Sequence, residues 1–124
     1  MTQEKPVIYL SSTRKNLEKL PKAVKDEFLH GLQEACRGRS HPSAKPLKGY
    51  KGRGVLELIN DYRGDTFRGV YTVKLKGVVY VLHVFKKKST KGIATPKKDK
   101  ELIDHRLRFA MSHHKEWIKG SLQK

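Results

Sequence analysis

The chain has 124 residues, a typical length for one compact domain, and we expect a single domain over residues 1–124 with its core at about residues 7–118. Lys and Arg number 28 against 12 Asp and Glu, and the resulting net charge of +16 attracts polyanions. Nucleic acid or an acidic protein is therefore the expected kind of partner. Cys36 is the only cysteine, which excludes an intrachain disulfide and a cysteine-rich zinc site.

The sequence gives no indication of a membrane segment. No apolar stretch approaches the roughly 18 residues that a membrane-spanning helix needs, and no long apolar helix face is flanked by Lys and Arg. Residues 1–10 also lack the apolar region of a signal peptide. We therefore expect a cytoplasmic protein without a membrane partner.

The first part of the chain predicts one strand followed by two helices. Residues 6–10 form a short β-prone run, and the hydroxyl residues after it suit a helix N-cap. Over residues 17–35 apolar side chains recur every three or four positions, as on an amphipathic helix. Pro21 interrupts this pattern, so we expect a kink or two helices that meet at Leu20–Pro21. Gly38 ends the helical region.

Three strands follow a basic loop. Residues 38–54 combine glycine and proline with several cations and show no periodicity, which predicts an ordered loop. Strands are predicted at Val55–Asn60, Thr66–Leu75 and Val78–Phe85, joined by tight turns into an antiparallel meander. The last of them is apolar at nearly every position, as expected for a central strand that is covered on both faces.

A second basic loop, over residues 86–96, precedes the last element. Thr95 and Pro96 suit the start of a helix, which the apolar stripe extends to residue 117 or beyond. We predict an α+β fold, with a small antiparallel-dominated sheet, two N-terminal helices and one C-terminal helix. The helices are expected to gather on one face of the sheet.

A lysine cluster is the first candidate site. Lys86, Lys87, Lys88 and Lys91 directly follow the most buried strand, so the fold should hold them as a group at the strand end. Fixed cations of this kind suit phosphate binding, whereas the alternative is a charge run that only keeps the protein soluble.

Arg68 is the second candidate, because it lies in the middle of a strand. Alternation places it on the face that carries Val70 and Thr72. One interpretation is a salt bridge to Asp65 or Glu57, since charged residues are seldom buried without a partner. The other is a guanidinium group that holds a scissile phosphate and its developing charge.

Histidine is the usual proton-transfer residue near neutral pH, and the chain has six, in no metal-binding spacing that we recognise. His83 lies within the central strand, where a structural, hydrogen-bonded imidazole is favoured over a catalytic one. His113 and His114 are expected to be exposed on the last helix.

Five short segments, in this order and spacing, together resemble a known family. They are Ala44-Lys-Pro-Leu-Lys-Gly49, Gly54-Val-Leu-Glu-Leu58, Phe67-Arg-Gly-Val-Tyr-Thr72, Val79-Tyr-Val-Leu-His-Val-Phe-Lys-Lys-Lys88 and Gly92-Ile-Ala-Thr-Pro96. The likeness spans roughly residues 7–110 and is to the phage-derived, HigB- and Tad-like toxins of the RelE/ParE superfamily.

The resemblance implies the toxin of a type II toxin–antitoxin system, paired with a cognate antitoxin that carries a helix-turn-helix domain and makes the contact with DNA. RelE-type members cleave mRNA on the ribosome by helping the ribose 2′-hydroxyl attack the adjacent phosphate, without a metal or cofactor. ParE-type members instead inhibit DNA gyrase. We expect the mRNA endonuclease, with a gyrase inhibitor or a non-catalytic nucleic-acid-binding protein as the alternatives.

The resemblance also implies roles for particular residues. Arg68 is similar in position to the phosphate-binding arginine of RelE-type nucleases, and Lys87, with Lys86 and Lys88 beside it, to their second basic residue. The strand lysines of RelE fall here near Leu56 and Leu58, and its later tyrosine has no counterpart. Proton transfer is therefore left to Glu57, His83 or Lys87 as candidates. We expect further RNA contacts from the cations Lys88, Lys91, Lys48, Lys51, Arg53, Arg106 and Arg108.

Overall fold

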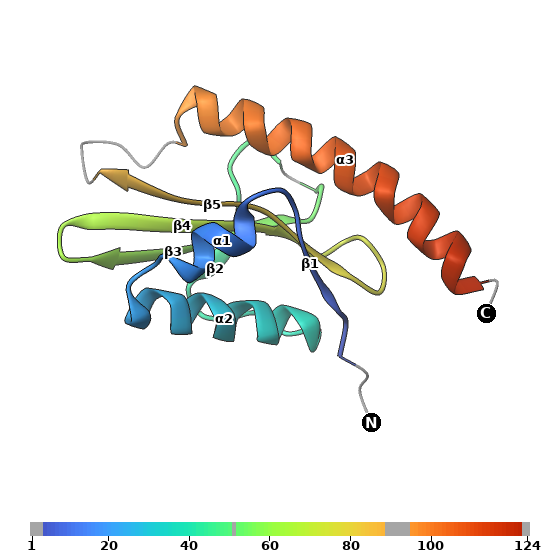
Figure 1. Ribbon diagram of the computed structural model, residues 1–124, viewed down its shortest axis with the longest axis horizontal. Coiled ribbons are helices and arrows are strands. Elements are labelled where there is room, and N and C mark those ends of the chain that lie inside the picture. The colour runs from blue at the N-terminus through green and yellow to red at the C-terminus, as the bar shows by residue number, and fades with distance from the viewer. Residues whose placement is uncertain (1–3, 51, 89–94, 123–124) are drawn as a thin grey trace.

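The computed structural model describes residues 4–50, 52–88 and 95–122, which form one five-stranded sheet with helices on both sides (Figure 1). The strand order is β1-β5-β4-β3-β2, in which β1 runs parallel to β5 and all other pairs are antiparallel. The predicted α+β class with an antiparallel-dominated sheet is confirmed. In chain order the elements are β1 (Val7–Tyr9), α1 (Thr13–Glu18), α2 (Lys22–Cys36), β2 (Ala44–Pro46), β3 (Val55–Tyr62), β4 (Asp65–Thr72), β5 (Val79–Lys88) and α3 (Lys97–Leu122).

The interrupted apolar pattern at Pro21 corresponds to two separate helices. Pro21 has φ −53° and ψ 143°, an extended conformation that ends one helix and allows the next to begin at Lys22. Leu17 of α1 and Phe28 of α2 then pack into the same core cluster against the sheet. The two N-terminal helices were thus predicted correctly from the sequence.

The expectation that all helices share one face of the sheet is wrong. In Figure 1, α3 crosses one face and α1 and α2 cover the other. Val81 packs with α1 and α2, whereas Tyr80, its neighbour on β5, packs with Ile103 of α3. Because side chains alternate along a strand, the continuous apolar run of β5 exposes apolar surface on both faces, and both must be covered.

The element boundaries also differ from the expectation. Residues 44–46, predicted as loop, form the edge strand β2, which is too short to show a period. β5 continues to Lys88, so the lysines after Phe85 begin on a strand and not on a loop. β3 is longer than predicted and β4 shorter. Between them a tight turn places Arg63 at φ 51° and Gly64 at φ 85°, as a two-residue hairpin of primed type requires.

One irregularity in the sheet shapes the α3 side. Val70 of β4 is paired with His83 of β5, yet the next residue, Tyr71, is paired with Val81. Leu82 is therefore an extra residue, and the strand has a β-bulge. As a result Leu82 and His83 both lie on the α3 face, although they are adjacent in sequence. Separately, no helix in the described part of the chain is both long and apolar enough to cross a membrane.

Candidate functional site

A cleft of about 280 Å³ lies on the α3 face of the sheet. It is bordered by β2 and the residues after it, by β3 and β4 beneath, and by the start of α3. Half of its lining residues are cations and one is a carboxylate: Lys45, Pro46, Leu47, Lys48, Glu57, Arg68, Thr95 and Lys100. Three of the sequence-predicted residues, Arg68, Glu57 and Lys48, thus lie in one cleft.

Arg68 and Glu57 form a buried ion pair in the floor of this cleft. The guanidinium Nη1 donates to Glu57 Oε2 at 3.1 Å, and the two residues are only 3% and 4% exposed. The same Nη1 lies 3.5 Å from the hydroxyl of Thr95. Of the two carboxylates considered from the sequence, Glu57 is the one that pairs with Arg68, while Asp65 lies 3.8 Å from Lys86.

The pair has an unusual electrostatic balance. Burial raises the pKa of Glu57 above its ordinary range, and Arg68 and Lys45 oppose this shift only in part. A carboxylate with a raised pKa accepts a proton more readily than an ordinary one near neutral pH. The cleft therefore combines a fixed guanidinium group with a carboxylate suited to proton transfer.

Lysines from three separate segments border the pair. Lys45 lies directly opposite Glu57 in the β2–β3 register, Lys48 follows β2, and Lys100 lies in the first turn of α3. The buried ring of Tyr50 connects the last two segments, because its hydroxyl bonds to Asp104 of α3. Sequence reasoning missed Lys45, Lys100 and Thr95 as members of the site. Recognition of β2 would have indicated Lys45, whereas Thr95 and Lys100 reach the cleft only through long-range packing.

The lysine cluster after the central strand is divided between the two faces. Lys87 is paired with Thr66, and alternation places it on the Arg68 face, where its charge lowers the pKa of Glu57. Lys86 is paired with Phe67 and lies on the opposite face. Lys88 is the last residue of β5. Lys91 and Lys51 lie outside the described residues.

The predicted arginines have different surroundings. Arg53 is exposed, and its guanidinium carbon lies 5.3 Å from the centroid of the Tyr50 ring. Arg108 is exposed on α3. Arg106 is half-buried and faces β5, where it donates to the carbonyl oxygen of Leu82 at 2.8 Å. Of the three arginines predicted to contact RNA, Arg53 and Arg108 therefore present their side chains largely to solvent and Arg106 does not.

His83 is buried beside the cleft and is absent from its lining. The residue is 7% exposed, its Nε2 lies 2.8 Å from Asp99 Oδ1, and burial lowers its pKa. The expectation that His114 is exposed is wrong, because its Nε2 lies 2.8 Å from the carbonyl oxygen of Lys76 and only 8% of the residue is exposed. His113 is exposed, as predicted.

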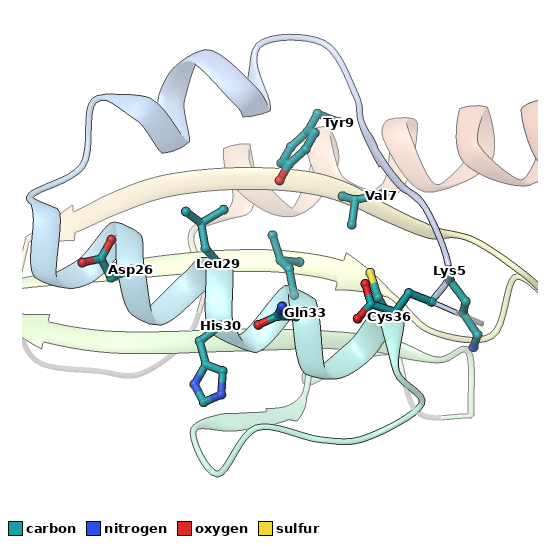
Figure 2. Close-up of a pocket in the computed structure, with 10 residues that line it drawn as sticks. Lys5, Val7, Tyr9, Asp26, Leu29, His30, Gln33 and Cys36 are labelled. Carbon is teal, nitrogen blue, oxygen red and sulfur yellow. The ribbon is translucent and has the colours of Figure 1, made fainter. Parts of the chain in front are cut away.

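A larger hollow, of about 480 Å³, lies between β1 and α2 (Figure 2). Its lining includes the acids Glu4 and Asp26 with the single cation Lys5, and Val7 and Leu29 belong to its apolar part. It therefore lacks the concentration of cations that distinguishes the smaller cleft. Within residues 4–50, 52–88 and 95–122, no three His, Cys, Asp or Glu side chains are grouped as a metal site would require.

Fold and site together define a small α+β protein with a cationic cleft above a buried Arg–Glu pair. The family model described as phage derived protein Gp49-like (DUF891) matches residues 15–108, and the chain belongs to this family. The phage-derived character inferred from the sequence is thereby confirmed. Among solved structures, the chain is similar to the toxin–antitoxin complex RelBE2 of Mycobacterium tuberculosis, with 22% identity, coverage of 70% of this chain and 95% of that chain, and a TM-score of 0.41. No curated protein matches the chain.

Proposed function

We propose that this protein is the toxin of a type II toxin–antitoxin system and that it cleaves ribosome-bound mRNA in the cytoplasm without a metal ion. The observation that carries the proposal is the Arg68–Glu57 pair in the floor of a lysine-bordered cleft. A guanidinium group binds a phosphodiester in a bidentate manner, and a carboxylate of raised pKa accepts a proton. The sequence resemblance to HigB- and Tad-like toxins, and membership of a phage-derived family, support the same function.

The chemistry divides between these residues as follows. Arg68 binds the non-bridging oxygens of the scissile phosphate and stabilises the charge that develops there. Glu57 accepts the proton of the ribose 2′-hydroxyl, whose oxygen attacks phosphorus and forms a 2′,3′-cyclic phosphate. The 5′-oxygen leaves and takes a proton from a bordering ammonium group, that of Lys45, Lys48 or Lys100. Every bond and proton is accounted for by groups in the cleft.

The substrate must compete with Glu57 for the guanidinium group. A dianionic transition state attracts Arg68 more strongly than a single carboxylate does, so the ion pair weakens as charge develops on phosphorus. Protonation of Glu57 in the same step reduces its attraction to Arg68 further. The pair therefore favours binding of the transition state over binding of the uncut strand.

The test is primer extension on an mRNA bound to purified ribosomes, with four proteins. Wild type should produce discrete cuts, while Arg68→Lys, which keeps the charge but loses the planar fork, and Glu57→Gln should cut at least about a hundredfold more slowly. Lys119→Ala, which removes an exposed cation near the far end of α3, is the matched control and should cut like wild type. Circular dichroism of each variant excludes loss of the fold as the cause.

Uncut mRNA together with growth arrest would contradict the nuclease. A supercoiling assay with purified gyrase then distinguishes a ParE-type inhibitor, which blocks supercoiling, from a protein that only binds nucleic acid.

An antitoxin is the second part of the proposal. We propose that an acidic segment of a small helix-turn-helix protein covers the cleft and neutralises its lysines, and that contact with DNA is made by that protein. Co-expression of the product of an adjacent reading frame should relieve growth arrest. If growth arrest persists although the two proteins copurify, the segment does not cover the site.

A further inference from the structure

Three side chains at the β-bulge of β5 connect the sheet to the start of α3. The bulge places His83 on the α3 face, where its Nε2 lies 2.8 Å from Asp99 Oδ1. Arg106 Nη1 lies 3.5 Å from His83 Nδ1 and donates to the carbonyl oxygen of Leu82 at 2.8 Å. Asp99 and Arg106 are seven positions apart, about two helical turns, so both lie on the side of α3 that faces β5.

The protonation state of His83 fits both contacts. Burial lowers the pKa of the imidazole, which favours the neutral ring. With its hydrogen on Nε2, the ring donates to Asp99 and leaves Nδ1 to accept from Arg106. Arg106 also donates to the carbonyl oxygen of Leu82, the extra residue of the bulge. His83, Asp99 and Arg106 therefore all take part in these contacts, and His83 is not among the residues that line the cleft.

The anchored end of α3 is the end that forms a wall of the cleft. Thr95 and Lys100 line the cleft, and Asp99 precedes Lys100 directly. On the opposite side of the helix, Tyr50 bonds to Asp104. The first turns of α3 are thus held from two sides, by β5 and by the segment that follows β2.

The same cluster reaches Arg68 through one aromatic ring. Phe85 stacks on His83, with ring centroids 4.4 Å apart and planes at 15°. Phe85 also lies directly opposite Arg68 in the β4–β5 register, on the same face. In an antiparallel pair such residues are in contact range, so the position of His83 affects both the α3 wall and the flank of Arg68.

We propose that His83, Asp99 and Arg106 act as positioning residues, which hold the α3 wall and Phe85 in place around Arg68 and Glu57. The inference rests on the proposed nuclease function and assigns to His83 a role other than proton transfer. Loss of the cluster should leave the chemical groups of the cleft intact but less well placed. The effect then falls mainly on kcat, since reaction needs closer alignment than binding does.

The test compares substitutions that remove or retain the His83–Asp99 hydrogen bond. His83→Leu and Asp99→Ala remove it, whereas His83→Gln keeps an amide N–H near the Nε2 position. We expect the first two to lower kcat on ribosome-bound mRNA about tenfold and to leave KM nearly unchanged. A factor of about ten is what the loss of one hydrogen bond to a charged group produces. His83→Gln should restore most of the lost rate. Equal inactivity of His83→Gln and His83→Leu would overturn the proposal, because a proton-transfer residue tolerates neither change.

A second measurement does not depend on cleavage. Hydrogen exchange in a peptide spanning residues 97–107 reports the anchoring of α3 directly. Asp99→Ala should accelerate exchange there about tenfold, while Glu101→Ala, an exposed neighbour, should not. Unchanged exchange in Asp99→Ala would overturn the positioning role. If wild type cuts no mRNA but the exchange result holds, the proposed function fails and the anchoring remains.

Discussion

Replacement of Arg68 by methionine tests the electrostatics of the site most directly. Arg68 and Glu57 are both almost fully buried, so Arg68→Met leaves a buried carboxylate without its guanidinium partner. Removal of one member of a buried pair typically costs about 3 to 5 kcal/mol of unfolding free energy. Replacement of both, in Glu57→Leu with Arg68→Met, removes the charges together and should bring stability to within about 1 kcal/mol of wild type or above it.

The loss of unfolding free energy in Arg68→Met should depend on pH. Because burial raises the pKa of Glu57, the folded state holds a proton over a range of pH where the unfolded chain has already released it. Stability therefore falls as pH rises through this range, by at most about 1.4 kcal/mol per pH unit for one group. Arg68 normally lowers this pKa, so its removal extends the range to higher pH. Arg68→Met should then be closest to wild type at about pH 5 and furthest from it at about pH 8.

Urea unfolding of wild type, Arg68→Met and the double variant, followed by circular dichroism at both pH values, measures these differences. The difference in unfolding free energy between the single and the double variant isolates the contribution of Glu57, because the two variants share all other titratable groups. Equal stability of Arg68→Met and wild type at both pH values would refute the reasoning. A double variant less stable than Arg68→Met would show that the two charges do not depend on each other.

Three further predictions follow from the same structure. Gly31→Ala should lower the free energy of unfolding in urea by about 1 to 3 kcal/mol, because an added Cβ would lie 2.7 Å from the methyl carbons of Leu58. Gly120→Ala is the control and should be neutral or stabilising, since a Cβ there meets no atom within 4 Å. Binding of a fluorescent RNA oligonucleotide should weaken steeply with salt, and Lys48→Ala should reduce the log–log slope by about one; an unchanged slope would place Lys48 outside the RNA contact. Burial raises the pKa of Tyr71 to about 12 and also raises the pKa of Tyr50, so ultraviolet titration should find tyrosines that ionise late. Tyr71→Phe should remove one of these late-ionising groups and leave that of Tyr50, whereas an unchanged titration would refute the assignment.

Much of the fold was predictable because its signals are local. The interruption at Pro21 separates two amphipathic helices, and the apolar run around Val81 indicates a central strand. Arg68 was recognisable as a candidate site residue because a charged side chain in the middle of a strand needs a partner or a cleft. The class of partner remains a prediction from net charge and composition, which depend on no contact between residues.

The arrangement of the site depended on contacts between distant segments. Residues 44–46 form a strand only because β3 offers them an edge, and this pairing brings Lys45 opposite Glu57. His83 faces α3 because a bulge shifts the alternation of β5 by one residue, which no pattern in its own segment reveals. Periodicity reports which side chains share a face, but the packing of α3 against the sheet determines which of them meet. Residue types and their faces were therefore readable from the chain, whereas the cleft itself arises from the crossing of α3 over the sheet.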